Sequence, residues 1–445
     1  MLKKFAFIAV FAAGAAFAQQ AEAPPIEVDV VGGVNAPMAI AVPPLATPRD
    51  AFTSAGQTGP LGIQMAEIIA NNLRSSGAFV PVGPQGVRGY TYHEAAAPVF
   101  PQWRATGTSS LVTGFVEARP DGRLTVGCYL YDVTAGRELT RQGYVVAAND
   151  WRRAAHRCSD AIYARLSGQT GMFDTRIVYV AETGPKTNRV KRIAIMDADG
   201  SNHRYLTEAR TTVLTPRFSP DGRRLAYMSY AGRRPRIWVL DIATGQERLL
   251  VHGTAMTFAP RFSPDGRQIV FSMAVGGNTD IYIVDADGYG EPRRLTDAAG
   301  ADTSPSFSPD GRRIVFESDR SGTQQLYVMN SDGSAQRRIS FTGGARYASP
   351  VWSPRGDLIA FTRIGGGAFR IGVMSPSGSG ERILTNSWQD EGPSWAPNGE
   401  FVMFHRTELG SGRTSLHAVS VQGGDPRRLI TPQDGSDPSW SPLQN

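Results

Sequence analysis

The sequence predicts an α/β region followed by an all-β propeller of six blades, which the C-terminal strand closes. The main observation is a repeat: Pro-Arg-Phe-Ser-Pro-Asp-Gly and related sequences begin at residues 216, 260, 305, 350, 393 and 438, in steps of 43 to 45 residues. That period is typical of a four-stranded propeller blade. A second observation is that the residues before the repeats carry helical spacing of apolar side chains, which predicts a different fold there.

Composition excludes several classes of protein. Of the 445 residues, 41% are hydrophobic and 19% charged, which is too apolar for a disordered chain. The 49 Gly and 30 Pro follow no three-residue period, so they indicate many tight turns rather than collagen. The net charge of +6 is spread among interspersed Arg and Asp, so we expect no nucleic-acid partner.

The first eighteen residues are typical of a secretory signal peptide. Lys3 and Lys4 precede an apolar run over 5–17, and Ala16-Phe17-Ala18 offers a small-x-small cleavage site. The apolar run is too short to span a membrane, and a buried helix would explain neither the lysines nor the polar residues that follow. We expect export, with cleavage near Ala18.

Two segments lie between the signal peptide and the repeats. Residues 19–33 begin with a Pro-rich polar stretch and continue with alternating apolar and acidic residues, which predicts a mobile strand that pairs with a sheet of its own domain or of another protein. Residues 34–170 predict a small α/β domain. Its expected strands are 37–43, 77–82, 110–118, 123–132 and 138–146, and its expected helices are 62–73 and 151–166.

Each repeat predicts four short strands within a propeller over 171–445. In one unit the motif aromatic Phe262 lies in the first strand, Ser-Pro-Asp-Gly forms a turn, and strands follow at 267–271, 280–284 and 293–296. The unit at 176–207 lacks a first strand, whereas 438–442 is a first strand with nothing after it. Joining the two completes a sixth blade and removes the open edges.

Catalytic motifs are absent from the sequence. There is no Gly-x-Ser-x-Gly elbow or phosphate-binding loop, and the six histidines lie far apart. Asp221, Asp265 and Asp310 could hold an ion, but an aspartate in such a turn ordinarily bonds the nearby backbone. We therefore expect a binding protein without catalytic residues, metal or cofactor; the alternative is an exported propeller hydrolase or a small-ligand sensor.

The two cysteines leave two possibilities open. Cys128 falls on the apolar face of a predicted strand, and Cys158 falls on the apolar stripe of the helix 151–166. If that helix covers that face the thiols can meet, and disulfides persist in exported proteins. The alternative is two separately buried thiols.

The chain resembles the TolB family in the segment 26–33, the helix end 70–77, the start of the propeller at 174–177 and all six repeats. The resemblance implies a periplasmic, non-enzymatic monomer that binds the lipoprotein Pal through its propeller and the inner-membrane protein TolA through its mature N-terminus. It also implies a role in outer-membrane integrity and in constriction during cell division. Such a protein is held at the membranes only through its partners.

The resemblance also implies site residues. The TolA-binding segment maps to Ile26, Glu27, Val28, Asp29, Val30 and Val31. In the family this segment either extends to TolA or folds back on the protein, and Pal favours the folded-back form. The Pal-binding positions map to Thr257, Phe258, Ala259, Asp302, Thr303 and Ser304, at the end of the propeller opposite the Pro-Asp-Gly turns. Alternatively, these residues merely begin strands.

Overall fold

The computed structural model describes residues 37–232 and 234–444. The predicted signal peptide and the predicted TolA-binding segment lie outside the described residues. In the described part of the chain, no helix is both long enough and apolar enough to cross a membrane.

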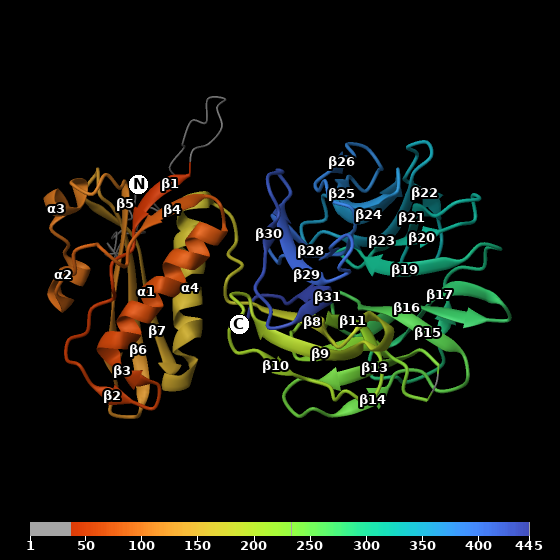
Figure 1. The fold of residues 1–445 in the computed structure, drawn as a ribbon, viewed down its shortest axis with the longest axis horizontal. Coiled ribbons are helices and arrows are strands. Elements are labelled where there is room, and N and C mark those ends of the chain that lie inside the picture. The colour runs from red at the N-terminus through yellow and green to blue at the C-terminus, as the bar shows by residue number, and fades with distance from the viewer. Residues whose placement is uncertain (1–36, 233, 445) are drawn as a thin grey trace, which may run out of the picture. The chain divides into compact units, whose positions relative to one another are not determined.

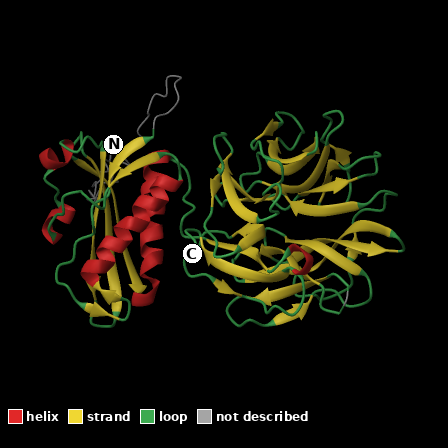
Figure 2. Ribbon diagram, viewed as in Figure 1, coloured by secondary structure: helices red, strands yellow, loops and turns green. Residues whose placement is uncertain are grey.

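The α/β region is built on a five-stranded sheet with helices on both faces (Figures 1 and 2). The central strand β5 pairs in parallel with β1 and antiparallel with β6, in the sheet order β4-β1-β5-β6-β7. The strands are β4 (Phe79–Val82), β1 (Met38–Ala41), β5 (Ser110–Ala118), β6 (Arg123–Asp132) and β7 (Arg137–Ala147). A separate hairpin joins β2 (Phe52–Thr53) to β3 (Gly56–Gln57).

Two long helices, α1 (Thr58–Ser75) and α4 (Trp151–Ser167), cover one face of this sheet, and the short α2 (Tyr92–Ala96) and α3 (Phe100–Arg104) cover the other. On α1 the side chains of Met65, Ile69 and Leu73 recur every four residues and are fully buried. A Cβ on Gly62 would lie 2.2 Å from the Leu45 carbonyl oxygen, so only glycine allows α1 to approach the chain so closely.

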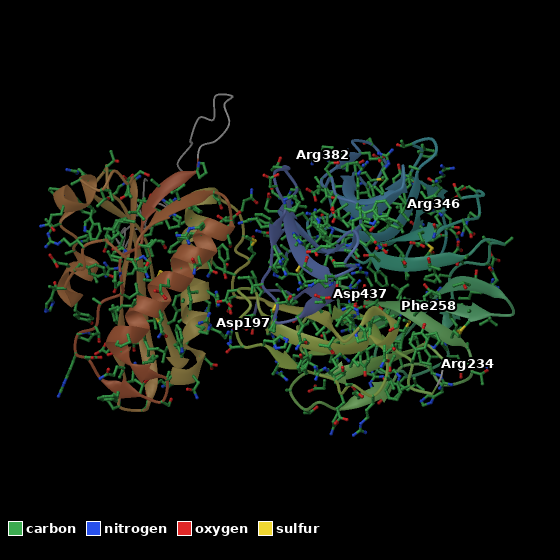
Figure 3. All side chains as sticks on the ribbon, in the orientation of Figure 1. Asp197, Arg234, Phe258, Arg346, Arg382 and Asp437 are labelled. Carbon is green, nitrogen blue, oxygen red and sulfur yellow. A yellow bond between two sulfur atoms is a disulfide. The ribbon has the colours of Figure 1, made fainter. Side chains whose placement is uncertain are left out.

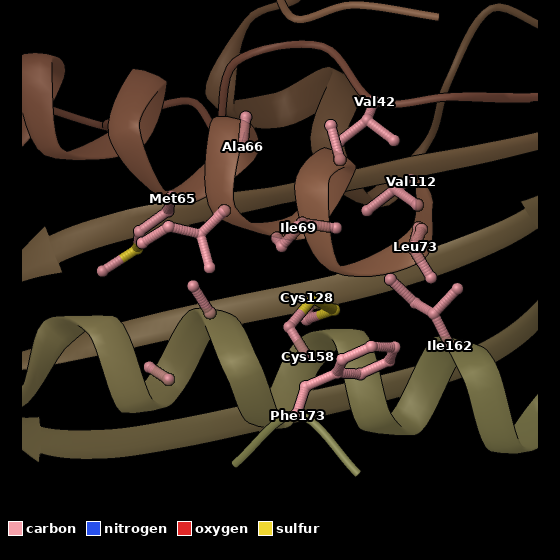
Figure 4. Packing of buried hydrophobic residues seen from close by; sticks show 14 of the residues in the cluster. Val42, Met65, Ala66, Ile69, Leu73, Val112, Cys128, Cys158, Ile162 and Phe173 are labelled. Atoms are coloured by element: carbon pink, nitrogen blue, oxygen red, sulfur yellow. A yellow bond between two sulfur atoms is a disulfide. The ribbon is translucent and has the colours of Figure 1, made fainter. Parts of the chain in front are cut away.

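A disulfide joins the sheet to α4. Cys128 on β6 and Cys158 on α4 are bonded, with their Cα atoms 5.9 Å apart. Figure 4 shows this bond among buried apolar side chains that include Leu73 and Ile162. The bond therefore links two elements that already share a core.

The propeller consists of six four-stranded sheets. The first three are β31 (Asp434–Trp440), β8 (Arg176–Thr183), β9 (Val190–Asp197), β10 (Arg204–Tyr205); β11 (Val213–Phe218), β12 (Arg224–Ser229), β13 (Arg236–Asp241), β14 (Glu247–Leu249); and β15 (Met256–Phe262), β16 (Gln268–Val275), β17 (Asn278–Asp285), β18 (Arg293–Arg294). The other three are β19 (Asp302–Phe307), β20 (Arg313–Ser318), β21 (Gln325–Asn330), β22 (Arg337–Arg338); β23 (Arg346–Trp352), β24 (Ile359–Gly365), β25 (Ala368–Met374), β26 (Arg382–Ile383); and β27 (Asp390–Trp395), β28 (Phe401–Thr407), β29 (Thr414–Ser420), β30 (Arg427–Arg428).

The C-terminal strand closes the ring as predicted. β31 runs antiparallel to β8, so one blade contains strands from both ends of the propeller (Figure 1). The Trp440 indole N–H donates to the Thr175 hydroxyl at 2.8 Å, and the Ser441 N–H donates to the Arg176 carbonyl. The predicted six-bladed propeller closed by the C-terminal strand is confirmed.

Adjacent blades pack through one aromatic ring in each blade. The ring lies on the second strand from the channel and is almost fully buried at Tyr179, Tyr227, Phe271, Phe316, Phe361 and Phe404. Burial of one such ring stabilises the fold by about 2–3 kcal/mol. In the Pro-Asp-Gly turns, Asp265 accepts the Arg267 N–H at 3.1 Å, and Asp221 and Asp310 accept equivalent bonds. These aspartates stabilise their own turns.

Candidate protein-interaction face

The two ends of the propeller carry different segments. On one blade Met256, at the start of β15, pairs with Ala274 near the β16–β17 loop, while Phe262 pairs with Ile269 beside the Pro-Asp-Gly turn. We call the end with the second-to-third-strand loops and the connections between blades the loop face, and the end with the Pro-Asp-Gly turns the turn face. Residues 257–259 and 302–304 lie at the starts of β15 and β19, on the loop-face side.

A β-bulge interrupts the inner strand of every blade on this side. The register shifts by one extra inner-strand residue, for example between Phe258 and Arg261 opposite β16. The residue before the motif proline has a left-handed backbone, with φ from 49° to 53° at Thr215, Ala259, Ser304, Ser349 and Asp437 and 66° at Gly392. We call these six residues the bulge ring. The ring was not predicted from the sequence, although a proline follows each of the six residues and marks its position.

The bulges also connect neighbouring blades. The freed N–H of Ser349 donates to the Glu317 carboxylate at 2.8 Å, and that of Thr215 donates to Asp437 at 3.2 Å. In both cases the acceptor belongs to the preceding blade. Burial raises the pKa of Glu317, and the hydrogen bond from Ser349 opposes the rise. The bulge ring is therefore held by polar contacts between blades.

The six predicted Pal-binding residues divide into two groups. Thr257 and Asp302 are buried: the Thr257 hydroxyl accepts the Ile237 N–H at 3.0 Å, and Asp302 pairs with Arg320 at 2.6 Å. Phe258, Ala259, Thr303 and Ser304 are half-buried and keep exposed surface. Figure 3 labels Phe258 on β15 and Asp437 on β31. Of the six residues, only these four half-buried ones have surface that a partner could contact.

Large apolar side chains are exposed in the loops and connections that belong to the loop face. Six of them have exposed fractions from 41% at Tyr230 to 75% at Leu409. The set is Tyr230, Met256, Val275, Phe341, Trp388 and Leu409. Single exposed apolar residues are ordinary, but a set that recurs around one end of a fold is typical of a surface that binds other proteins.

The described residues contain one group with potential metal ligands: His156, Asp197 and Asp199, whose ligand atoms lie within 4.8 Å of one another. The Arg152 guanidinium already donates to Asp199. The Asn72 amide N–H donates to His156 Nδ1 at 2.9 Å, which leaves the ring proton on Nε2. Because a protonated Nε2 cannot bind a metal, we interpret this group as a charge network.

The architecture places the chain among proteins that join an α/β region to a six-bladed β-propeller. Family models give the finer assignment: the TolB amino-terminal domain matches residues 26–139, and the TolB beta propeller domain matches residues 163–444. The chain belongs to the TolB family.

Individual relatives agree with this assignment. The Tol-Pal system protein TolB of Rhizorhabdus wittichii is 58% identical over 227 residues, which are 51% of this chain and 50% of the relative. That of Zymomonas mobilis is 54% identical over 211 residues, 47% of this chain and 46% of the relative. The chain thus spans about half the length of the curated relatives it matches. The crystal structure of TolB from Acinetobacter baumannii superposes with a TM-score of 0.80 at 29% identity, covering 91% of this chain and 97% of that one.

Proposed function

We propose that this chain is a non-enzymatic, periplasmic component of the Tol-Pal system. It binds Pal through the loop face of the propeller and TolA through its mature N-terminal segment, and it supports outer-membrane integrity and constriction during division. Membership of the TolB family and the name of its relatives support the system. The exposed apolar side chains on the loop face are the observation that supports the Pal surface.

The loop face suits a stable protein interface because buried ion pairs anchor the strands beneath it. The buried pairs Asp302–Arg320 and Asp390–Arg406 fix the strand starts, with Arg406 bonding both carboxylate oxygens of Asp390 at 2.7 and 2.9 Å. A preorganised surface loses little conformational entropy on binding. Apolar side chains that stand on such a frame supply the area that leaves water when a partner docks.

The TolA proposal depends on the segment 26–31. In an extended chain Ile26, Val28 and Val30 point to one side and Glu27 and Asp29 to the other, so the segment can add a strand to a partner sheet through its backbone. If Pal favours the form in which this segment is folded back, Pal lowers the affinity for TolA, and TolA lowers the affinity for Pal by the same factor.

Titration calorimetry with purified Pal tests the loop face. Thr303→Trp places a bulky ring among the half-buried residues and should weaken Pal binding at least tenfold, as is typical of a central interface position. The control is Gln268→Trp, which adds the same side chain at an exposed position beside the turn face and should bind Pal as wild type does. Wild-type affinity in a folded Thr303→Trp protein would reject this surface.

Removal of residues 19–33 tests the TolA segment. The truncated protein should keep the thermal transition of the propeller and lose TolA binding. With the intact protein, saturating Pal should reduce the TolA affinity. Equal TolA affinities with and without Pal would mean two independent sites.

A further inference from the structure

The propeller channel has an unusual composition at its turn-face side. A cavity of about 370 Å³ is lined there by the motif residues of all six blades. The residues that follow the motif prolines form its inner ring: Arg217, Arg261, Ser306, Val351, Ser394 and Ser439. Two neighbouring blades thus contribute an arginine at a position where three others contribute a serine.

These two cations have little compensating charge. No Asp or Glu lines the cavity. Arg217 Nη1 donates to the carbonyls of Pro216 at 2.9 Å and Pro438 at 3.2 Å. The Arg261 backbone pairs with Val270, but its guanidinium has no hydrogen bond or ion pair with any residue that the structure describes. The Asp437 carboxylate acts on Arg217 and opposes the fall of its pKa, but one Asp437 oxygen already accepts the Thr215 N–H.

The surroundings make this charge costly. Burial lowers the pKa of Arg217, and burial together with the Arg217 cation lowers the pKa of Arg261. The aromatic motif side chains, among them Phe262 and Trp352, give the wall an apolar character. Both side chains are half-buried, and the Asp437 charge acts on Arg217 but not on Arg261. Two neighbouring like charges in a cavity with an apolar wall are unfavourable unless an anion joins them.

Neutral donors are also present in the ring. Ser306 Oγ accepts the backbone N–H of Trp352 at 3.3 Å, and Ser394 Oγ accepts the backbone N–H of Trp440 at 3.0 Å. Neither hydroxyl donates a hydrogen bond to a described residue, so its proton is available to another acceptor. The ring therefore offers guanidinium and hydroxyl donors together.

We propose that this part of the channel binds a small oxyanion, which is a phosphate, a sulfate or a carboxylate group. The planar guanidinium fork matches two oxygens of such a group, and the serine hydroxyls complete its hydrogen bonds. The two arginines exclude a metal cation from the same position by repulsion. The site is independent of the proposed Pal surface, since it lies on the turn-face side of the motif prolines.

Titration calorimetry with inorganic phosphate, sulfate and acetate, in a constant chloride background, tests the site. We expect saturable binding by the wild-type protein, tighter for the divalent anions than for acetate. Arg261→Gln and Arg217→Gln should each weaken phosphate binding at least tenfold. The matched control is Arg267→Gln, which removes an exposed arginine from the adjacent turn and should bind as wild type does.

Thermal unfolding gives a second measurement on the same proteins. Phosphate should raise the midpoint of the wild type and of Arg267→Gln more than that of Arg261→Gln, since all three experience the same general salt effect. Without oxyanion, Arg261→Gln should unfold at the same or a higher temperature than wild type, because a half-buried guanidinium without a hydrogen-bond partner is gone. Absence of phosphate binding by the wild type, or undiminished binding by folded Arg261→Gln, would overturn the proposal.

Discussion

At the bulge ring, five residues other than glycine hold a left-handed backbone immediately before a proline, where an extended backbone is usual. Thr215 is the most constrained of them because it is β-branched, and its hydroxyl has no hydrogen-bond partner among the described residues. This conformation costs about 1–2 kcal/mol in a residue with a Cβ atom. Gly392 occupies the equivalent position in another blade without that cost.

We therefore expect Thr215→Gly to change the free energy of unfolding by less than about 0.5 kcal/mol, since relief of strain offsets the greater entropy of glycine in the unfolded chain. Thr362 is a matched control: it is buried on β24, its hydroxyl is also unpartnered, and its φ is not positive. Thr362→Gly should cost about 2 kcal/mol. Urea denaturation measures both values, and similar losses would contradict the strain at Thr215.

His417 should make stability depend on pH. Its ring stacks on Phe404 with centroids 5.8 Å apart, and burial, followed by the Arg406 charge, lowers its pKa from 6.5 to about 4. The unfolded chain therefore binds a proton more readily, and the free energy of unfolding should fall by up to about 3 kcal/mol as the pH drops from 6.5 to 4.

The variant His417→Phe isolates this contribution, because all other groups titrate equally in both proteins. One of them, Asp160, has a pKa raised to about 6 by burial and acts in the opposite direction. Denaturation at several pH values should show wild type losing stability relative to the variant below pH 6.5. Parallel curves would contradict the shifted histidine.

Among the elements, β6 and α4 are joined by the disulfide that bridges a separation of 30 residues. A cross-link over a loop of this length stabilises a protein by about 3–4 kcal/mol, mainly by restricting the unfolded chain. The double variant Cys128→Ala, Cys158→Ala should lose about that much stability. Peptide mapping without reductant should find 128 and 158 linked, and alkylation of both thiols in the denatured, unreduced protein would refute the bond.

Strand β31 is the element that closes the propeller. Deletion of residues 438–445 removes the Ser439 and Trp440 pairs with β8 and leaves an open edge. We expect loss of the single cooperative transition and aggregation on heating. A shorter deletion of 443–445, which keeps every β31 pair, is the control. An unchanged calorimetric transition after the longer deletion would show that closure is dispensable.

At the scale of the whole molecule, the propeller could be predicted because each copy of the repeated motif marks the end of an inner strand and the turn that follows it. The closure followed from the incomplete units at 176–207 and 438–442. Two features could not be predicted because they depend on neighbours in space. The bulge N–H groups of Thr215 and Ser349 donate to acceptors on the preceding blade, and the cavity that Arg261 lines is formed together with residues of five other blades.

The burial of the six predicted Pal-binding residues also could not be predicted from the sequence. They are adjacent in sequence within two short runs, but only the fold shows that Thr257 and Asp302 are buried while Phe258 and Thr303 keep exposed surface. Alternation along a strand does not separate them, because the bulge between Phe258 and Arg261 interrupts the period of two.

Site-specific photo-crosslinking measures most directly whether Pal docks on the loop face. A photoreactive phenylalanine analogue at Phe258 probes the loop face, and the same analogue at Tyr289, an exposed aromatic beyond the β17 turn, probes the turn face. Illumination of each protein with purified Pal should give a covalent Pal adduct from position 258 and none from position 289. An adduct from position 289 alone, or equal adducts from both positions, would contradict the loop face as the Pal-binding surface.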